Sequence, residues 1–299
     1  MKEVLSWALL VLIIPGFTGC SKSVSNKEKI VFVSILPQKY FVERIAGDLV
    51  QVEVMVQPGH NPATYEVTPV QLSKLQKASL YFRVGVPFEK AWLSKLKEVN
   101  PNLQIIDTRL GMPLRAMPDL EGIHALLQGR ADDHNHHGEK DPHIWLSPEL
   151  VKIQAETIYL ALAELLPGNR EIMEQNLLAF KSELVELQKE IRNLLDGLTN
   201  RKFLVFHPSW GYFAEEFGLI QIPIEIEGKA PVARELAAII DLARQHDIRV
   251  VFVQKQFSTM EAQAVAETIK GKVIRIDPLA ENYLTNLRQI AYSFRENLN

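Results

Sequence analysis

Short runs of apolar and β-branched residues recur along the chain, and stretches with helical spacing separate them. The runs fall into two groups, one early and one late in the sequence. Alternation of this kind is typical of α/β folds, in which helices connect parallel strands. We therefore predict an α/β protein with two lobes, whose strands cover residues 30–35, 52–56 and 80–84 in the first lobe and 203–206, 250–253 and 273–276 in the second.

A single apolar stripe predicts one long helix between the two groups of strands. The stripe runs from Met173 to Leu198 in alternating steps of four and three residues, which keeps it on one helix face. A helix over residues 169–198 would be roughly 45 Å long at 1.5 Å per residue. We interpret it as a connector between the lobes. The alternative is a coiled-coil dimer built on the same stripe.

These patterns divide the chain into segments. We expect an N-terminal lobe at residues 28–165, a connecting helix at 166–199 and a C-terminal lobe at 200–299. The length is sufficient for two domains of ordinary size. The hydrophobic fraction of 47% and the charged fraction of 23% are those of an ordinary globular protein. With a net charge of -3 and no basic stripe, we expect no nucleic-acid partner.

The first residues have the pattern of a secretory signal. Lys2 precedes an apolar run at 4–17, which is too short to span a bilayer comfortably, so we expect residues 1–19 to be removed. Cys20 is the only cysteine, and an unpaired thiol in an exported protein needs an explanation. The sequence Phe17-Thr18-Gly19-Cys20 resembles a bacterial lipobox, which implies a lipid on Cys20 followed by a polar tether over 20–27. The alternative is an ordinary signal peptide with a chance cysteine near its end.

Candidate metal ligands follow three of the predicted strands. Ligands of open parallel sheets bind beyond the carboxyl ends of the strands, where this sequence has His60, His207 and Asp277. His143 lies just before Ser147-Pro148-Glu149, a segment with the pattern of a helix start. Three imidazoles and one carboxylate would form a closed four-coordinate zinc site. Each histidine alone would more often be a surface or core residue, and it is their shared position at element ends that makes the group a candidate.

Five segments carry a more specific signal. They are PGHNPATYEVTP from Pro58, DPHIWLSP from Asp141, FHPSWGYFAEEFGL from Phe206, FVQKQFS from Phe252 and IDPLAENY from Ile276. Together they resemble the zinc and manganese solute-binding proteins of ABC importers, the ZnuA/TroA-like family. The resemblance implies two (β/α) lobes joined by one long helix, a metal site in the cleft between the lobes, and delivery of the metal to a membrane permease. It also implies that His143, His207 and Asp277 are metal ligands.

One departure from the family pattern concerns the first ligand. The family usually has Pro-His-x-Tyr-Glu, whereas this chain has Pro62-Ala63-Thr64-Tyr65-Glu66. His60 lies three residues before Ala63 in the same loop, and we predict that it replaces the missing histidine. Glu66 or a water molecule is the alternative. Three histidines would favour Zn²⁺, whereas two histidines with one or two acids would make Mn²⁺ or iron more credible.

The remaining charged and histidine-rich segments have weaker interpretations. His134, His136 and His137 lie in an acidic, polar stretch at 132–139, which we interpret as weak secondary metal capture or as a merely solvated loop. His124 and His246 have no motif around them and are expected to be structural or exposed. For Glu225, Glu227 and Lys229 we favour a solvated loop over charge placed for function.

The expected function is extracytoplasmic capture of a divalent transition metal, most simply Zn²⁺, and its delivery to an ABC permease with its ATPase. We expect a monomeric lipoprotein of the cell envelope, held to a membrane by its lipid on the periplasmic or extracellular face. We expect no enzyme, because neither a His-Glu-x-x-His nor a Gly-x-Ser-x-Gly segment is present. A zinc hydrolase and a metal-dependent adhesin are the alternatives of a different class.

Overall fold

The computed structural model describes residues 29–117, 140–225 and 228–298. Several predicted features lie outside these residues: the signal at 1–19, Cys20 and its tether, and the secondary-capture histidines His134, His136 and His137. Among the described helices, none is both long enough and apolar enough to cross a membrane.

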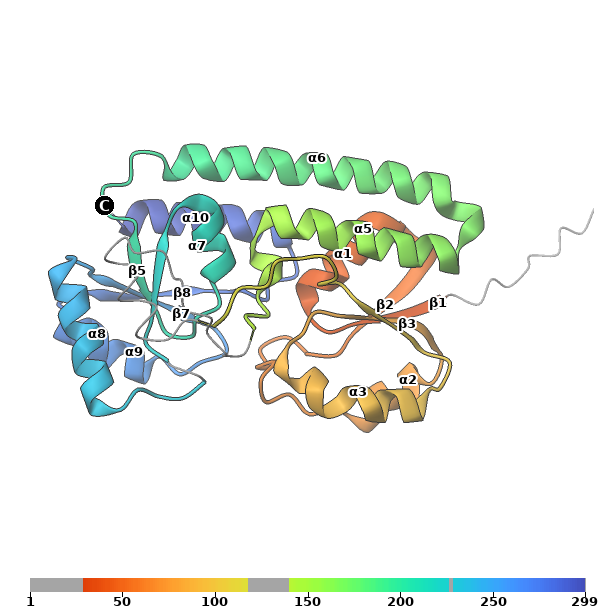
Figure 1. Cartoon of the computed structure of the whole chain (residues 1–299), viewed down its shortest axis with the longest axis horizontal. Coiled ribbons are helices and arrows are strands. Elements are labelled where there is room, and N and C mark those ends of the chain that lie inside the picture. The colour runs from red at the N-terminus through yellow and green to blue at the C-terminus, as the bar shows by residue number, and fades with distance from the viewer. Residues whose placement is uncertain (1–28, 118–139, 226–227, 299) are drawn as a thin grey trace, which may run out of the picture.

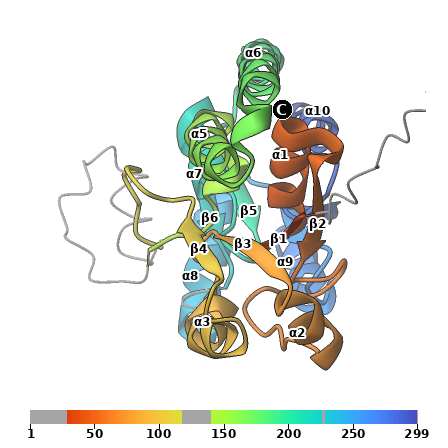
Figure 2. The same cartoon turned by 90° about the vertical axis from the view of Figure 1, so that its right-hand side faces the viewer.

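The N-terminal lobe is built on a four-stranded parallel sheet with the strand order β2-β1-β3-β4. Helices cover both of its faces, with α1 and α5 on one face and α2 and α3 on the other (Figure 2). Strands buried on both faces become nearly continuous apolar runs, and Val31, Phe32 and Val33 of β1 are fully buried. The elements are β1 (Lys29–Val33), α1 (Leu36–Ala46), the 3-10 turn η1 (Gly47–Leu49), β2 (Val50–Val54), α2 (Pro69–Leu75), β3 (Ala78–Arg83), α3 (Pro87–Val99) and β4 (Gln104–Asp107).

The C-terminal lobe has a second four-stranded parallel sheet, with the order β6-β5-β7-β8. Because successive strand residues point to opposite faces, Phe203 and Phe252 pack under α7 and α10, whereas Leu204 and Val251 belong to a separate core with α8 and α9. The elements are β5 (Lys202–Val205), α7 (Gly211–Phe217), β6 (Ile220–Pro223), α8 (Ala233–Gln245), β7 (Val250–Gln254), α9 (Met260–Thr268), β8 (Lys272–Ile276) and α10 (Tyr283–Asn297).

One long helix runs the length of the molecule and connects the lobes (Figure 1). This is α6 (Arg170–Leu195), which follows the 3-10 turns η2 (Ile144–Leu146) and η3 (Pro167–Asn169) and the helix α5 (Pro148–Leu165). Its predicted stripe is buried against α5, α1 and α10, with Phe180 packed on Phe41 at 5.8 Å between ring centroids. The stripe is therefore used within one chain, which argues against the coiled-coil dimer.

The predicted fold class is confirmed: two α/β lobes are joined by one long helix. All six predicted strands overlap observed ones. Two strands were missed, β4 and β6, and both lie at a sheet edge. β6 ends in Pro223, which cannot donate to a neighbouring strand and is tolerated at such an edge. The boundaries at residues 165 and 199 stay a prediction.

Candidate metal centre

The carboxyl ends of strands from both sheets meet at one cavity of about 300 Å³. Parallel α/β sheets bind their ligands at these strand ends, so the cavity lies where a ligand of two such lobes is expected. Its walls come from the segments after β1 and β2 in the first lobe and after β7 and β8 in the second. The lining residues are Ile35, Leu36, Val56, Gln57, Pro58, Gly59, Gln256, Asp277, Leu279, Ala280 and Glu281.

Two of the predicted ligands, His143 and His207, lie side by side. Their ring centroids are 5.3 Å apart, and the ring planes meet at 73°. His143 precedes η2 in the loop before α5, whereas His207 follows β5 by two residues. The pair therefore joins residues that are 64 positions apart in the sequence and belong to different lobes.

His143 is held by a buried carboxylate. Asp141 has no exposed surface, and its Oδ1 accepts one hydrogen bond from the His143 backbone N–H (3.0 Å) and one from the His143 ring Nδ1 (2.7 Å). Because a carboxylate only accepts, Nδ1 carries the proton and Nε2 keeps its lone pair. Burial lowers the pKa of His143, against the opposite effect of Asp141. The ring is therefore kept neutral, as a metal ligand must be.

His207 has the same arrangement with a different acid. Its ring Nδ1 donates to Glu225 Oε2 at 3.0 Å, which again leaves Nε2 free to bind a cation. The imidazole stacks on the ring of Phe257, with centroids 5.0 Å apart and 18° between planes. Its backbone N–H and carbonyl oxygen both bond the side-chain amide of Gln254 at the end of β7. Ring and backbone are thus fixed from three sides.

The expectation of a solvated loop is wrong for Glu225. Its side chain is buried, with 6% of the residue exposed, because its backbone N–H donates to the carbonyl oxygen of Phe206 and fastens it beside β5. Lys229 is exposed, in agreement with the expectation. Glu227 lies outside the described residues.

Asp277 directly follows β8 and lies in the cavity wall. Its Oδ1 accepts from the backbone N–H of Leu279 (2.9 Å) and from Gln256 Nε2 (3.3 Å). Its Oδ2 lies 3.3 Å from the ammonium nitrogen of Lys255. Both carboxylate oxygens are therefore engaged by donors of the same lobe.

His60 lies in an exposed turn beside the cavity. Gln57, Pro58 and Gly59 line the cavity, whereas His60 is absent from the lining. Its Nδ1 is 3.3 Å from the carbonyl oxygen of Pro58, and its ring meets the ring of Tyr65 edge-on at 5.6 Å. Gly59 has a φ of 80°, a conformation that permits the tight turn because glycine has no Cβ.

The structure thus brings together His143 and His207 but not the whole predicted set. In the described ranges, no three histidine, cysteine, aspartate or glutamate side chains are grouped so that they could hold one ion. Glu66, the alternative to His60, is exposed. The four-ligand set of His60, His143, His207 and Asp277 stays a prediction.

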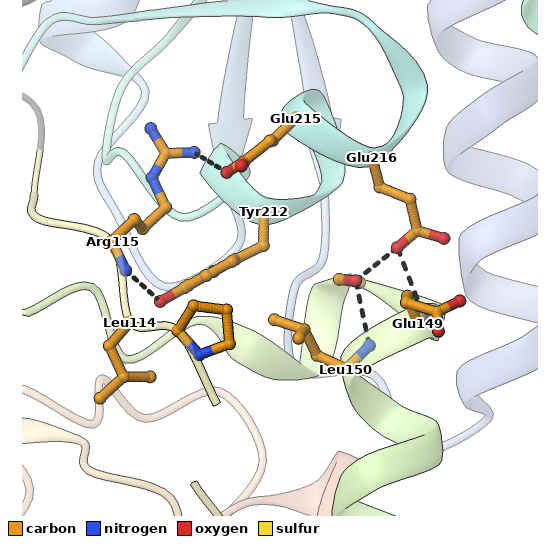
Figure 3. Close-up of a pocket in the computed structure, with 9 residues that line it drawn as sticks. Leu114, Arg115, Glu149, Leu150, Tyr212, Glu215 and Glu216 are labelled. Carbon is orange, nitrogen blue, oxygen red and sulfur yellow. Dashed lines mark hydrogen bonds and ion pairs between the residues drawn. The ribbon is translucent and has the colours of Figure 1, made fainter. Parts of the chain in front are cut away.

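A second cavity, of about 370 Å³, is lined by residues of α7, of the start of α5 and of the segment around Arg115 (Figure 3). Tyr212, whose hydroxyl donates to the carbonyl oxygen of Asp141 at 3.1 Å, lines it, as does Arg115, whose Nε is 3.7 Å from Asp141 Oδ2. Glu216 also lines it and accepts hydrogen bonds from the Ser147 hydroxyl and the Glu149 backbone N–H. These side chains support Asp141 and the start of α5.

Sequence reasoning missed the carboxylates that orient the histidines. Asp141 is part of the segment Asp141-Pro142-His143, and an acid two residues before a candidate ligand is a usable signal. Glu225 gave no such signal, because its position depends on β6, which was not predicted. Lys255 was also missed as the partner of Asp277.

The comparisons with known proteins point to one family. The family described as zinc-uptake complex component A, periplasmic (ZnuA) matches residues 31–297. The high-affinity zinc uptake system protein ZnuA of Yersinia pestis is 31% identical over 288 residues, which cover 88% of this chain and 89% of that protein. The manganese ABC transporter substrate-binding lipoprotein PsaA of Streptococcus pneumoniae is 27% identical over 284 residues, which cover 89% of this chain and 86% of that protein.

The likeness extends to solved structures. A crystal structure of a ZnuA deletion mutant with zinc bound has 43% sequence identity and a TM-score of 0.83, and the match covers 91% of this chain and 98% of that one. Apart from the first two residues of β1, all strands and helices of both lobes and the long helix fall within the family match at residues 31–297. The chain therefore belongs to the ZnuA family of periplasmic zinc-uptake components.

Proposed function

We propose that this protein captures Zn²⁺ outside the cytoplasm and delivers it to an ABC permease and its ATPase. The observation that carries the proposal is the pair His143 and His207, whose rings approach to 5.3 Å between centroids. Each ring donates its Nδ1–H to a buried carboxylate, and each keeps Nε2 for an ion. Histidines that bind metal commonly make this second contact, which fixes the tautomer and the ring orientation.

Zinc suits this donor set better than harder cations do. Zn²⁺ binds neutral imidazole nitrogens well, whereas Mg²⁺ and Ca²⁺ prefer oxygen ligands. In our proposal Asp277 supplies a carboxylate oxygen and His60 a third imidazole. With water or Glu66 in place of His60, Mn²⁺ or iron is the alternative cargo, and the manganese protein PsaA among the relatives supports keeping it.

We propose that binding and release are the whole activity. The family consists of substrate-binding components of uptake systems, and a closed set of four protein ligands leaves no coordination position for a reactive water. A monomer of two lobes is sufficient for capture. The proposed boundaries are 28–165 and 200–299 for the lobes and 166–199 for the connector.

The proposed location is the cell envelope. In this proposal residues 1–19 are removed, Cys20 carries a lipid, and 20–27 tether the folded body to a membrane. The relative PsaA is named a lipoprotein, which supports the anchor. We also keep His134, His136 and His137 as a secondary capture segment.

Elemental analysis tests the cargo. The protein is purified without added metal, analysed for zinc, manganese and iron, then stripped with a chelator and offered zinc and manganese together. We expect about one zinc per chain, retained against an excess of manganese, as the metal-affinity order requires for nitrogen ligands. Preferential retention of manganese would mean that the cargo is Mn²⁺ and not Zn²⁺. Retention of no transition metal would refute the proposal.

A further inference from the structure

Lys255 and Asp277 occupy equivalent positions at the ends of neighbouring strands. β7 and β8 are parallel, and their register pairs Gln254 with Ile276 as the last residues of the two strands. Lys255 directly follows β7, and Asp277 directly follows β8. Strand register therefore places an ammonium beside the predicted ligand carboxylate, with 3.3 Å between Nζ and Oδ2.

The two partners differ in how freely they can move. The Asp277 side chain is 17% exposed, and its Oδ1 is fixed by the backbone N–H of Leu279, whereas the Lys255 side chain is 63% exposed. A lysine on a flexible stem can leave this position at little cost, since exposed ion pairs contribute little to stability. The carboxylate in the cavity wall cannot leave so easily.

We propose that Lys255 is a built-in competitor of the captured cation for Asp277. The inference rests on the proposed function, in which Asp277 is a metal ligand. A cation bound to Asp277 and the ammonium beside the same carboxylate repel each other. Metal binding must either displace Lys255 or proceed against this repulsion, so the lysine weakens binding and speeds release to the permease.

The competition acts through charge and not through ligand geometry. Divalent cations of equal charge are repelled equally, so Lys255 lowers the affinity for Zn²⁺ and Mn²⁺ by the same factor. Because the exposed ammonium can move away from the ion at little cost, we expect about a three- to fivefold effect on the dissociation constant at low ionic strength. Salt screens interactions between exposed charges, so the effect shrinks as the ionic strength rises.

The test compares Lys255→Gln with two controls. Lys255→Arg keeps the charge, and Lys272→Gln removes the same charge at the exposed, opposite end of β8. Zinc and manganese affinities are measured by chelator competition, and zinc release by stopped flow. We expect Lys255→Gln to bind both metals about three- to fivefold more tightly at low salt and to release zinc more slowly, with the gain much reduced at about 0.5 M salt. Both controls should behave as the parent does. Equal or weaker binding by Lys255→Gln at low salt overturns the inference.

Asp277→Asn separates this inference from the proposed function. If Asp277→Asn weakens zinc binding and Lys255→Gln fails to tighten it, the competition is refuted while the ligand assignment stands. If Asp277→Asn binds zinc as the parent does, the ligand assignment fails and the inference fails with it. In the double variant, the gain from Lys255→Gln should be lost, because the carboxylate for which the two cations compete is absent.

Discussion

The indole N–H of Trp145 donates a hydrogen bond of 2.7 Å to the carbonyl oxygen of Pro278. Trp145 is buried and lies two residues after His143, with 5.1 Å between the two ring centroids. Pro278 directly follows Asp277. The bond therefore connects the loop that carries one predicted ligand to the loop that carries another, although the two bonded residues are 133 positions apart in the sequence.

Trp145→Phe tests this connection. Phenylalanine keeps an aromatic ring but has no donor, so the buried carbonyl of Pro278 loses its partner. We expect the free energy of unfolding of the metal-free protein to fall by about 1–3 kcal/mol, and zinc binding to weaken because the two loops are no longer joined. Urea unfolding measures the first effect and chelator competition the second. Trp92→Phe on α3, far along the chain from both loops, is the control; equal losses in both variants would contradict the account.

Glu225→Gln tests the buried acid behind His207. Replacing the carboxylate by an amide removes the charge that holds Nδ1–H in place. Loss of such a contact commonly weakens metal binding by about 10- to 100-fold, and we expect a loss of this size for zinc. The control is Glu215→Gln on α7, where the carboxylate is 71% exposed. A parent-like zinc affinity in Glu225→Gln would mean that this contact does not orient the ligand.

The lowered pKa of His143 predicts how the stability of the metal-free protein depends on pH. Burial keeps the folded ring neutral below the ordinary imidazole pKa of about 6.5, where the unfolded chain takes up a proton. The unfolded state then binds more protons than the folded state, so the free energy of unfolding decreases as the pH falls below about 6.5. Above that pH, His143 is neutral in both the folded and the unfolded state and adds no pH dependence to the free energy of unfolding.

Urea unfolding of the parent and of His143→Gln between about pH 8 and 5 measures this contribution. The difference in unfolding free energy between the two proteins should be constant above about pH 6.5 and should change steadily below it. Parallel profiles over the whole range would show that His143 is protonated alike in both states.

The central strands could be predicted because burial on both faces of the sheet makes their sequences almost entirely apolar. β1 and β7 are covered by helices on both faces, so nearly every residue is apolar. The edge strands β4 and β6 carry polar or proline residues, including Gln104, Asp107 and Pro223, which dilute the same signal. The apolar stripe predicts the long helix α6, but it does not show that α1, α5 and α10 pack against that stripe.

The site was less predictable than the fold. The sequence indicates which histidines follow strands, but the contact between His143 and His207 depends on how two lobes pack. The ion pair of Lys255 with Asp277 follows from the register of β7 and β8, and register between parallel strands is not visible in one sequence. Glu225 follows the edge strand β6, and because the sequence pattern does not indicate that strand, it gives no sign that Glu225 is buried.

His60→Ala tests the assignment of His60 as the third imidazole ligand. His60 is the only histidine in the loop that supplies Gln57, Pro58 and Gly59 to the cavity wall. We expect its removal to weaken zinc binding by at least about tenfold, the lower end of the losses caused even by contacts behind a ligand. His246→Ala should bind as the parent does. The double change His60→Ala with Ala63→His should recover affinity if both positions reach one ion, and a parent-like His60→Ala would transfer the role to Glu66 or water.

Zinc titration of the chelator-stripped protein tests the central claim, that His143 and His207 hold one ion between them. The account predicts one zinc per chain in the parent, with a dissociation constant well below about 1 μM. His143→Ala and His207→Ala should each weaken binding by at least about 100-fold, and the double variant should lose much less than the sum of the two losses, because both residues act on the same ion. Either single variant binding one zinc as tightly as the parent would contradict the account.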